Sequence, residues 1–157
     1  MALEIERKFL LRSDEWRGHV DSRDLLRQGY LSSGSACSIR VRIAGEHAWL
    51  NLKAKRSGMT RLEFEYPIPR TEADEILNEL STGPILEKYR HRIPMGDLVW
   101  EIDEFLGANA GLVVAEIELP SESAEFARPD WLGEEVTADE RYYNFNLARM
   151  PYQEWKR

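Results

Sequence analysis

Cysteine is almost absent from this chain, and long apolar runs are missing. The 157 residues include a single cysteine, Cys37, which excludes an intramolecular disulfide and any zinc site built from several cysteines. Such usage is typical of a reducing compartment. No run of about 18 apolar residues occurs, and the first residues lack the basic and apolar regions of a secretory signal. We therefore expect a cytoplasmic protein.

Familiar site motifs are missing as well. The sequence has no Walker A motif and no glycine-rich nucleotide fingerprint, and its histidines, His19, His47 and His91, show no ligand-like spacing. The net charge of −7 argues against a general nucleic-acid or membrane binder, because such proteins usually carry basic charge that neutralises phosphates. The composition, 43% apolar and 31% charged, indicates a single domain with a buried core over residues 1–157.

Short strands dominate the pattern that is present. Eight segments are rich in β-branched or aromatic residues, and most of them alternate apolar with charged side chains. They cover residues 3–11, 25–31, 37–43, 47–55, 60–68, 85–93, 97–105 and 112–119. Turn residues separate several of them, and eight such strands fit a closed antiparallel barrel.

Three helices are expected around these strands. One begins near Ser13, and a second follows the capping sequence Thr71-Glu72-Ala73-Asp74. The third opens at Thr137, with Glu140 three residues further on. The predicted fold class is therefore α+β, a closed eight-stranded antiparallel β-barrel flanked by a few helices.

Charged residues share one face of nearly every predicted strand. Successive side chains of a strand point to opposite faces, so residues two apart lie on the same face. The cations on these faces are Lys8, Arg40, Arg42, Lys53, Lys55, Arg61, Lys88, Arg90 and Arg92. The acids are Glu4, Glu6, Glu63, Glu65, Glu101, Asp103, Glu116 and Glu118.

Two orientations of the charged faces are open. They can form a solvated outer surface with cross-strand ion pairs, or they can point into the barrel. Ordinary exposed faces mix Thr, Ser, Gln and Asn with charges, whereas nearly every position here is charged, which favours the inward orientation. Since uncompensated buried charges cost several kcal/mol each, a charged lumen would be retained for ligand binding rather than for stability. The outward apolar faces would then be covered by the helices.

Such a lumen has the chemistry of a metal-assisted phosphoryl-transfer site. Clustered Arg and Lys side chains suit the oxygens of a polyphosphate. Carboxylates without His or Cys partners are hard oxygen ligands suited to Mg²⁺ or Mn²⁺. Together they predict binding of a triphosphate with a divalent metal, without a nucleophilic Ser, Cys or His.

The residues also carry a family resemblance. The chain resembles the CYTH superfamily, also called triphosphate tunnel metalloenzymes, whose N-terminal ExExK signature matches Glu4-Ile5-Glu6-Arg7-Lys8. Further matches follow in the family's order over residues 2–148, among them Ile39-Arg40-Val41-Arg42, Glu87-Lys88-Tyr89-Arg90, Glu101-Ile102-Asp103-Glu104-Phe105 and Glu116-Ile117-Glu118. The chain is most similar to the short, single-domain bacterial members. The resemblance implies an eight-stranded tunnel, a triphosphate substrate and Mg²⁺ or Mn²⁺, with two ions expected.

The resemblance also implies roles for individual residues. Metal ligands would be Glu4, Glu6, Glu116 and Glu118, with Glu63, Glu65, Glu101 and Asp103 as supporting or second-metal acids. Phosphate would be bound by Lys8, Arg40, Arg42, Lys53, Lys88 and Arg90, with Arg61 joining them. Catalytic roles are expected for Lys88, Tyr30, Glu116 and Glu118.

A few positions keep two interpretations. Tyr30, in the Gln28-Gly29-Tyr30 turn into the lumen, either orients substrate or water there or packs at a strand end. Arg141 either binds the substrate at one mouth or forms a structural salt bridge. Lys55 and Arg92 extend the basic stripes and lie either in the lumen or at its mouth.

The expected activity is hydrolysis of a triphosphate, with inorganic tripolyphosphate giving pyrophosphate and phosphate. The alternatives are a class IV-like adenylyl cyclase, a thiamine triphosphatase whose ring slot uses Trp49 or Trp131, and a non-catalytic polyphosphate or nucleotide sensor. The expected partner is a small-molecule triphosphate, with neither nucleic acid nor membrane. Both a monomer and a homodimer are compatible with the sequence.

Overall fold

The structure is a computed structural model that describes residues 3–32, 37–57 and 59–155, with side chains of 55–57 left aside. Antiparallel strands make up half of this part of the chain. The strands are β1 (Leu3–Leu11), β2 (Ser22–Ser32), β3 (Ser38–Ala44), β4 (His47–Ser57), β5 (Thr60–Pro67), β6 (Leu86–Met95), β7 (Leu98–Phe105), β8 (Val113–Glu118) and β9 (Leu132–Glu135). The eight predicted strands are therefore confirmed, and β9 was not predicted.

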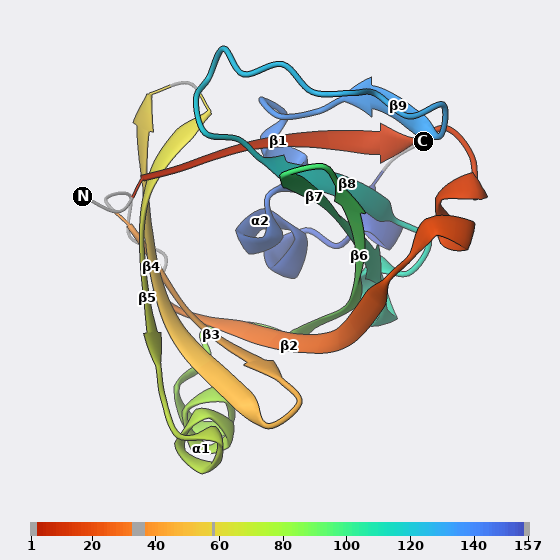
Figure 1. Ribbon diagram of the computed structural model, residues 1–157. Coiled ribbons are helices and arrows are strands. Elements are labelled where there is room, and N and C mark those ends of the chain that lie inside the picture. Colours follow the sequence, from red (N-terminus) through yellow and green to blue (C-terminus); the bar gives the residue numbers. More distant parts are fainter. Residues whose placement is uncertain (1–2, 33–36, 58, 156–157) are drawn as a thin grey trace.

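The sheet closes on itself through β1. The strands follow the order β5-β4-β3-β2-β6-β7-β8-β1, and β1 pairs with β5 through Leu3 and Leu62. Its other edge pairs with β8, where Lys8 lies opposite Glu116. This ring, seen end on in Figure 1, confirms the predicted eight-stranded barrel.

Strand β9 pairs with the same edge of β1 as β5, further along β1. It pairs at Phe9 with Glu135 and at Leu11 with Leu132. Gly133 permits this pairing, because a Cβ there would lie 2.9 Å from the carbonyl oxygen of Leu10. The segment is short and lacks the alternation by which strands are recognised in a sequence, so it escaped prediction.

The helical segments differ in part from those expected. The α-helices are α1 (Arg70–Leu80) and α2 (Asn144–Arg149), and the 3₁₀ segments are η1 (Glu15–His19), η2 (Gly107–Asn109), η3 (Glu140–Tyr142) and η4 (Tyr152–Glu154). The helix expected near Ser13 is the short segment η1. Helix α1 is confirmed, although its N-cap is Pro69, without a side-chain cap hydrogen bond, so Thr71 does not cap it.

The third predicted helix begins later than expected and is broken. Thr137 does not open it: its Oγ1 accepts a hydrogen bond of 3.0 Å from the backbone N–H of Lys8. Asp139 instead caps η3, and the extended backbone of Tyr143 separates η3 from α2. None of these helices is long and apolar enough to cross a membrane, as far as the described residues show.

Two clusters of the hydrophobic core lie outside the barrel, and a third lies on the inward strand faces, where Leu86, Phe105 and Val114 pack with Leu147 of α2. Helix α1 places Ala73 and Leu77 against Val41, Ile43 and Ala48 on the outer faces of β3 and β4. A second cluster forms around Phe9, Trp16, Trp100, Ile117 and Trp131. Helix α2 departs from the expected covering role, since it lies within the ring of strands in Figure 1.

Candidate functional site

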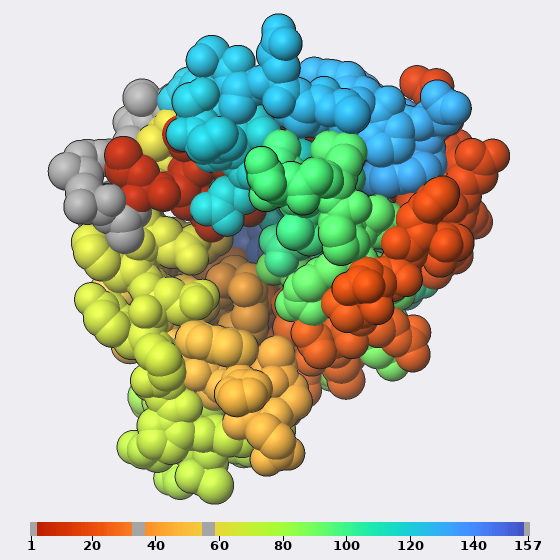
Figure 2. All heavy atoms as spheres, viewed as in Figure 1, coloured from red at the N-terminus to blue at the C-terminus, as the bar shows by residue number. Residues whose placement is uncertain are grey.

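The inward faces of the strands enclose a cavity of about 640 Å³. Figure 2 shows the hollow at the centre of the molecule, with atoms of the C-terminal segment visible in its depth. The predicted charged side chains that line it are Glu4, Glu6, Lys8, Arg40, Arg42, Lys53, Arg61, Glu63, Glu65, Lys88, Arg90, Arg92, Glu101, Glu116 and Glu118. The charged faces therefore point inward, which confirms the predicted lumen.

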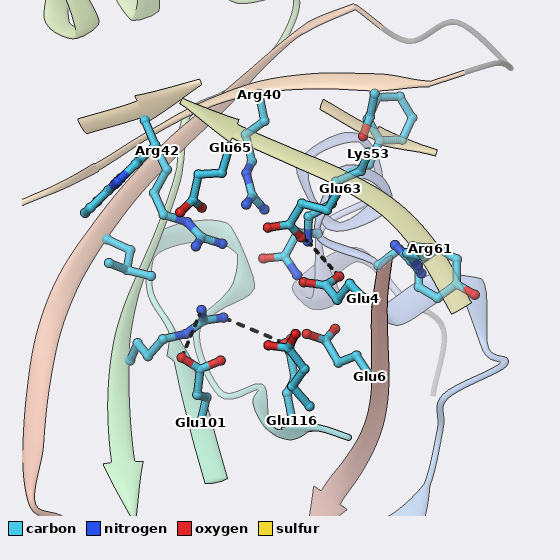
Figure 3. A pocket seen from close by; sticks show the side chains of 18 of the residues that line it. Glu4, Glu6, Arg40, Arg42, Lys53, Arg61, Glu63, Glu65, Glu101 and Glu116 are labelled. Carbon is cyan, nitrogen blue, oxygen red and sulfur yellow. Dashed lines mark hydrogen bonds and ion pairs between the residues drawn. The ribbon is translucent and has the colours of Figure 1, made fainter. Parts of the chain in front are cut away.

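An acidic wall forms where β1 meets β5 and β8. Figure 3 shows Glu4, Glu6 and Glu116 with their carboxylates close together. Burial, and then the neighbouring Glu116, raise the pKa of Glu6 to about 8. Burial and a hydrogen bond with the carboxyl group of Glu63 likewise raise the pKa of Glu4. Carboxylates forced this close together repel each other, and a bound cation would relieve the repulsion.

Two lysines partly balance this wall. Lys8 Nζ lies 3.3 Å from Glu116 Oε1 and 3.9 Å from Glu6 Oε1. Lys53 Nζ lies 3.4 Å from Glu4 Oε1 and 3.2 Å from Glu63 Oε2. Each lysine therefore contacts two of the acids, and the carboxylates do not converge on a single empty position.

The acidic wall fits a hard divalent cation by its chemistry rather than by a preformed cage. Within the described residues, no group of three or more His, Cys, Asp or Glu side chains stands ready to hold a metal ion. The donors are nevertheless all carboxylate oxygens, the ligands that Mg²⁺ and Mn²⁺ prefer. The raised pKa of Glu6 shows that its negative charge is under-compensated. The residues present therefore suit such an ion, provided that Lys8 and Lys53 shift their contacts.

A basic wall faces the acids. Arg40 and Arg42 reach into the cavity from β3, on the side opposite Glu6 and Glu116 in Figure 3. Burial, then the positive charges of Arg40 and Arg90, lower the pKa of Arg42 to about 9. An arginine held in such surroundings remains a cation at neutral pH and attracts an anion into the lumen.

The predicted metal-supporting Asp103 belongs to this basic side. Its Oδ2 accepts a 2.7 Å hydrogen bond from Lys88 Nζ, and Arg90 binds both of its oxygens at 2.8 and 2.9 Å. Both Asp103 and Lys88 are fully buried. Burial outweighs the attraction of Asp103 and lowers the pKa of Lys88 to about 7. The structure therefore brings Asp103 to Lys88 and Arg90 rather than to the acidic wall.

Two other predicted site residues lie away from the lumen. Tyr30 is part of β2, not of a turn, and its ring packs edge-on against Phe145 at 5.1 Å. It lines a separate cavity of about 240 Å³ behind α2. Arg141 is exposed and pairs with Asp139 at 2.6 Å, which corresponds to the salt-bridge interpretation. Neither residue lines the central cavity.

Lys55 and Arg92 extend the basic stripes, and the structure places the side chain of Arg92. Arg92 lines the cavity and also pairs with Asp24 at 2.6 Å. The side chain of Lys55 lies outside the described part of the structure.

Several lumen residues escaped the sequence prediction because they are not charged. Asn51 shares a face with Lys53, accepts from Arg40 at 3.2 Å and donates to Glu65 at 2.8 Å. Because Asn51 lies two residues before Lys53 on one strand, the sequence already indicated that both side chains share a face. Tyr143 and Asn144 come from the C-terminal segment, where no strand period marks them. The Tyr143 ring lies 4.5 Å from the Arg61 guanidinium.

The two tryptophans proposed for a ring slot lie in different places. Trp49 lines the central cavity, next to His47. Trp131 is buried in the outer core against Trp100, with ring centroids 5.6 Å apart. Only Trp49 of this pair is placed to meet a ligand in the lumen.

A closed antiparallel barrel with opposed acidic and basic walls defines a charged-tunnel protein. The chain belongs to the CYTH domain family, whose model matches residues 2–149. It is 46% identical over 156 residues to an inorganic triphosphatase of Acetivibrio thermocellus, covering 99% of each chain. An inorganic triphosphatase of Nitrosomonas europaea is 39% identical and covers 92% of this chain and 96% of its own.

The fold has a close counterpart among solved structures. A crystal structure of an inorganic triphosphatase superposes with a TM-score of 0.64 at 36% sequence identity. The match covers 92% of this chain and 97% of the other. The similarity therefore extends over the whole barrel rather than over a local motif.

Proposed function

We propose that this protein hydrolyses inorganic tripolyphosphate to pyrophosphate and phosphate, with the help of Mg²⁺ or Mn²⁺ and with two ions expected. The observation that carries the proposal is the opposition of an acidic and a basic wall across one cavity. The names of two relatives that match nearly the whole chain support the same substrate. The single cysteine supports a cytoplasmic location for this activity.

The basic side chains would bind the phosphates. The proposed binders are Lys8, Arg40, Arg42, Lys53, Arg61, Lys88 and Arg90, all of which line the cavity. Forked guanidinium groups suit bidentate contacts to phosphate oxygens, and lysines act as point charges. A polyanion would also relieve the mutual repulsion that lowers the pKa of Arg42.

The carboxylates would hold the metal. Glu4, Glu6, Glu63 and Glu116 are the closest set, and Glu65, Glu101 and Glu118 line the same cavity. A divalent ion bound there would polarise the phosphate oxygens and help to activate water. Lys8 and Lys53, now paired with these acids, would be released to contact phosphate.

Lys88 is the residue proposed to act closest to the reacting atoms. Its lowered pKa, about 7, leaves a substantial fraction of neutral amine near neutral pH. The neutral Nζ can accept a proton from an attacking water, and the protonated form can stabilise negative charge that develops on phosphate. The packed ring of Tyr30 and the exposed Arg141 receive no chemical role in this proposal.

A substrate panel tests the proposal. The protein is incubated with Mg²⁺ and separately with tripolyphosphate, ATP and thiamine triphosphate, and the products are resolved. Phosphate and pyrophosphate from tripolyphosphate, without cyclic AMP from ATP, support the proposal. Thiamine triphosphate is the second candidate because Trp49 lines the lumen; faster turnover of that ester, or cyclic AMP formation, would overturn the proposed substrate.

A further inference from the structure

Two amide side chains connect helix α2 to the basic wall. Asn144 Oδ1 accepts hydrogen bonds from Lys88 Nζ at 2.7 Å and from Gln28 Nε2 at 3.0 Å. Gln28 Oε1 in turn accepts from Arg42 Nε at 3.1 Å. The chain of contacts therefore runs from one lumen cation to another through two neutral residues.

The orientation of both amides is determined by their partners. Lysine and arginine side chains can only donate hydrogen bonds when charged, so an amide oxygen must face each of them. With its oxygen toward Arg42, Gln28 presents its nitrogen to Asn144. The Asn144 oxygen then meets donors on both sides. Since each amide has one orientation that satisfies its neighbours, the network fixes a single geometry.

Lys88 is held between two acceptors from different elements. Asp103 of β7 accepts from its Nζ at 2.7 Å, and Asn144 of α2 accepts at the same distance. Lys88 is fully buried along its length, yet it lines the cavity. Two fixed acceptors leave the amine one remaining tetrahedral direction for a ligand.

We propose that Asn144 is a positioning residue that aims Lys88 Nζ at the bound phosphate, a role that rests on the proposed triphosphatase function. Helix α2 then does more than close one end of the lumen, because it supplies a second acceptor for Lys88 Nζ beside Asp103 of β7. Gln28 holds the Asn144 oxygen in place and couples it to Arg42. The role is distinct from direct catalysis, since Asn144 acts through the lysine.

The position of α2 does not depend on Asn144 alone. The buried Asn109 donates from Nδ2 to the carbonyl oxygen of Leu147 at 3.2 Å. Its Oδ1 accepts from the backbone N–H of Tyr152 at 2.8 Å. The buried Leu147 also packs into a core cluster with Phe105 and Tyr142. Substitution of Asn144 should therefore leave the helix in place.

A double-mutant cycle tests the proposal. The variants are Asn144→Leu, Lys88→Met and the double variant, and Asn146→Leu is the matched control. Asn146 lies on the same helix, but its amide donates to the carbonyl oxygen of Glu140. Affinity for tripolyphosphate is measured by calorimetry with EDTA present, so that no metal-dependent turnover occurs, and kcat and KM are measured with Mg²⁺.

The proposal predicts that Asn144→Leu lowers affinity and kcat/KM by about tenfold in the wild-type background and by less than about twofold beside Lys88→Met. Asn146→Leu should stay within about twofold of wild type in both. Equal losses from Asn144→Leu in both backgrounds, or no loss in either, would overturn it. If wild type binds tripolyphosphate without turnover, the proposed function fails while the affinity cycle still decides the positioning role. Absence of binding by wild type would overturn both.

Discussion

Lys8 of β1 and Glu116 of β8 lie opposite each other in the sheet, and Lys8 Nζ is 3.3 Å from Glu116 Oε1. The pair joins the two kinds of group that the proposed function needs, the proposed phosphate binder Lys8 and the proposed metal ligand Glu116. Both side chains are buried. A buried ion pair contributes little net stability compared with apolar packing, so its presence at this point is better explained by ligand binding.

Glu116 provides a direct test of the acidic wall. Glu116→Gln keeps the size of the side chain and its hydrogen bond with Lys8 but removes the charge. We expect metal-dependent turnover to fall by about 100-fold or more, because a ligand charge at the metal is lost. Steady-state rates over a Mg²⁺ titration measure the effect, with the exposed Glu134→Gln as control. Near-normal activity at saturating Mg²⁺ would remove Glu116 from the site.

Arg42 should show opposite effects on stability and on binding. Arg42→Met removes a cation that lies beside Arg40 and Arg90, so the ligand-free protein should gain about 1 kcal/mol of unfolding free energy. Affinity for tripolyphosphate should fall by about tenfold, since a charge-assisted phosphate contact is lost. Denaturant unfolding and calorimetry measure the two quantities.

The control for this substitution is Arg27→Met, on the outer side of β2, where the guanidinium pairs with Asp74. It should change neither affinity nor turnover by more than about twofold, since it removes a half-buried ion pair that lies outside the lumen. A loss of stability in Arg42→Met together with unchanged affinity would mean that Arg42 has a structural role.

The pH dependence of stability follows from Glu6. Burial raises its pKa to about 8 in the folded protein from the ordinary glutamate value of 4.5, so the folded state retains a proton that the unfolded state releases. This contribution is fully present below pH 4.5 and is lost as the pH rises through 8. Unfolding free energy in EDTA should therefore decline between pH 5 and 7, by at most about 1.4 kcal/mol per pH unit from this group.

Other groups titrate near this range, and Glu4 and Glu118, whose pKa values are also raised by burial, add to the same decline. The lowered pKa of Lys88, about 7, raises stability with pH only above that value, and the lowered pKa of Glu116 acts only under acidic conditions. Between pH 5 and 7, Glu6→Gln should reduce the decline of the unfolding free energy in EDTA. Adding Mg²⁺ to the wild-type protein should also reduce it, because the ion competes with the proton for the carboxylate. A variant with the slope of wild type would contradict the raised pKa of Glu6.

Ligand binding should stabilise the empty lumen. A ligand that binds the folded state alone adds about 2.7 kcal/mol to the unfolding free energy at 100 times its dissociation constant, and we expect tripolyphosphate to act in this way. Melting temperatures with and without ligand measure this shift, and sulfate at equal ionic strength is the control for general salt effects. No shift at millimolar tripolyphosphate would argue that the charged faces do not bind it.

The sequence predicted the barrel because each strand carries its own signal. Alternation with a period of two identifies which side chains share a face, and the uniform charge of that face indicated the lumen. The same rule placed Asp103 on the inward face, but it could not show that Lys88 and Arg90 donate hydrogen bonds to both of its carboxylate oxygens. Tyr30 likewise lies on the inward side of β2, yet α2 separates it from the central cavity.

The C-terminal contribution to the site could not be found in this way. Asn144 and Tyr143 reach the lumen only because the chain returns from β9 to close one end of the barrel, a long-range arrangement without local periodicity. The amides Gln28 and Asn51 carry no formal charge, whereas the lumen was indicated by the charged residues of the strand faces. The position of Asn51 on the face of Lys53 could be read from the sequence, but its bonds to Arg40 and Glu65 are visible only in the structure.

The most direct test of the central claim is a ³¹P NMR time course of tripolyphosphate with wild-type protein and Mg²⁺. A triphosphatase should make the tripolyphosphate signals disappear while phosphate and pyrophosphate appear in equal amounts, and EDTA should stop the reaction. Unchanged tripolyphosphate over hours, at protein concentrations where the barrel is folded and Mg²⁺ is saturating, would contradict this claim.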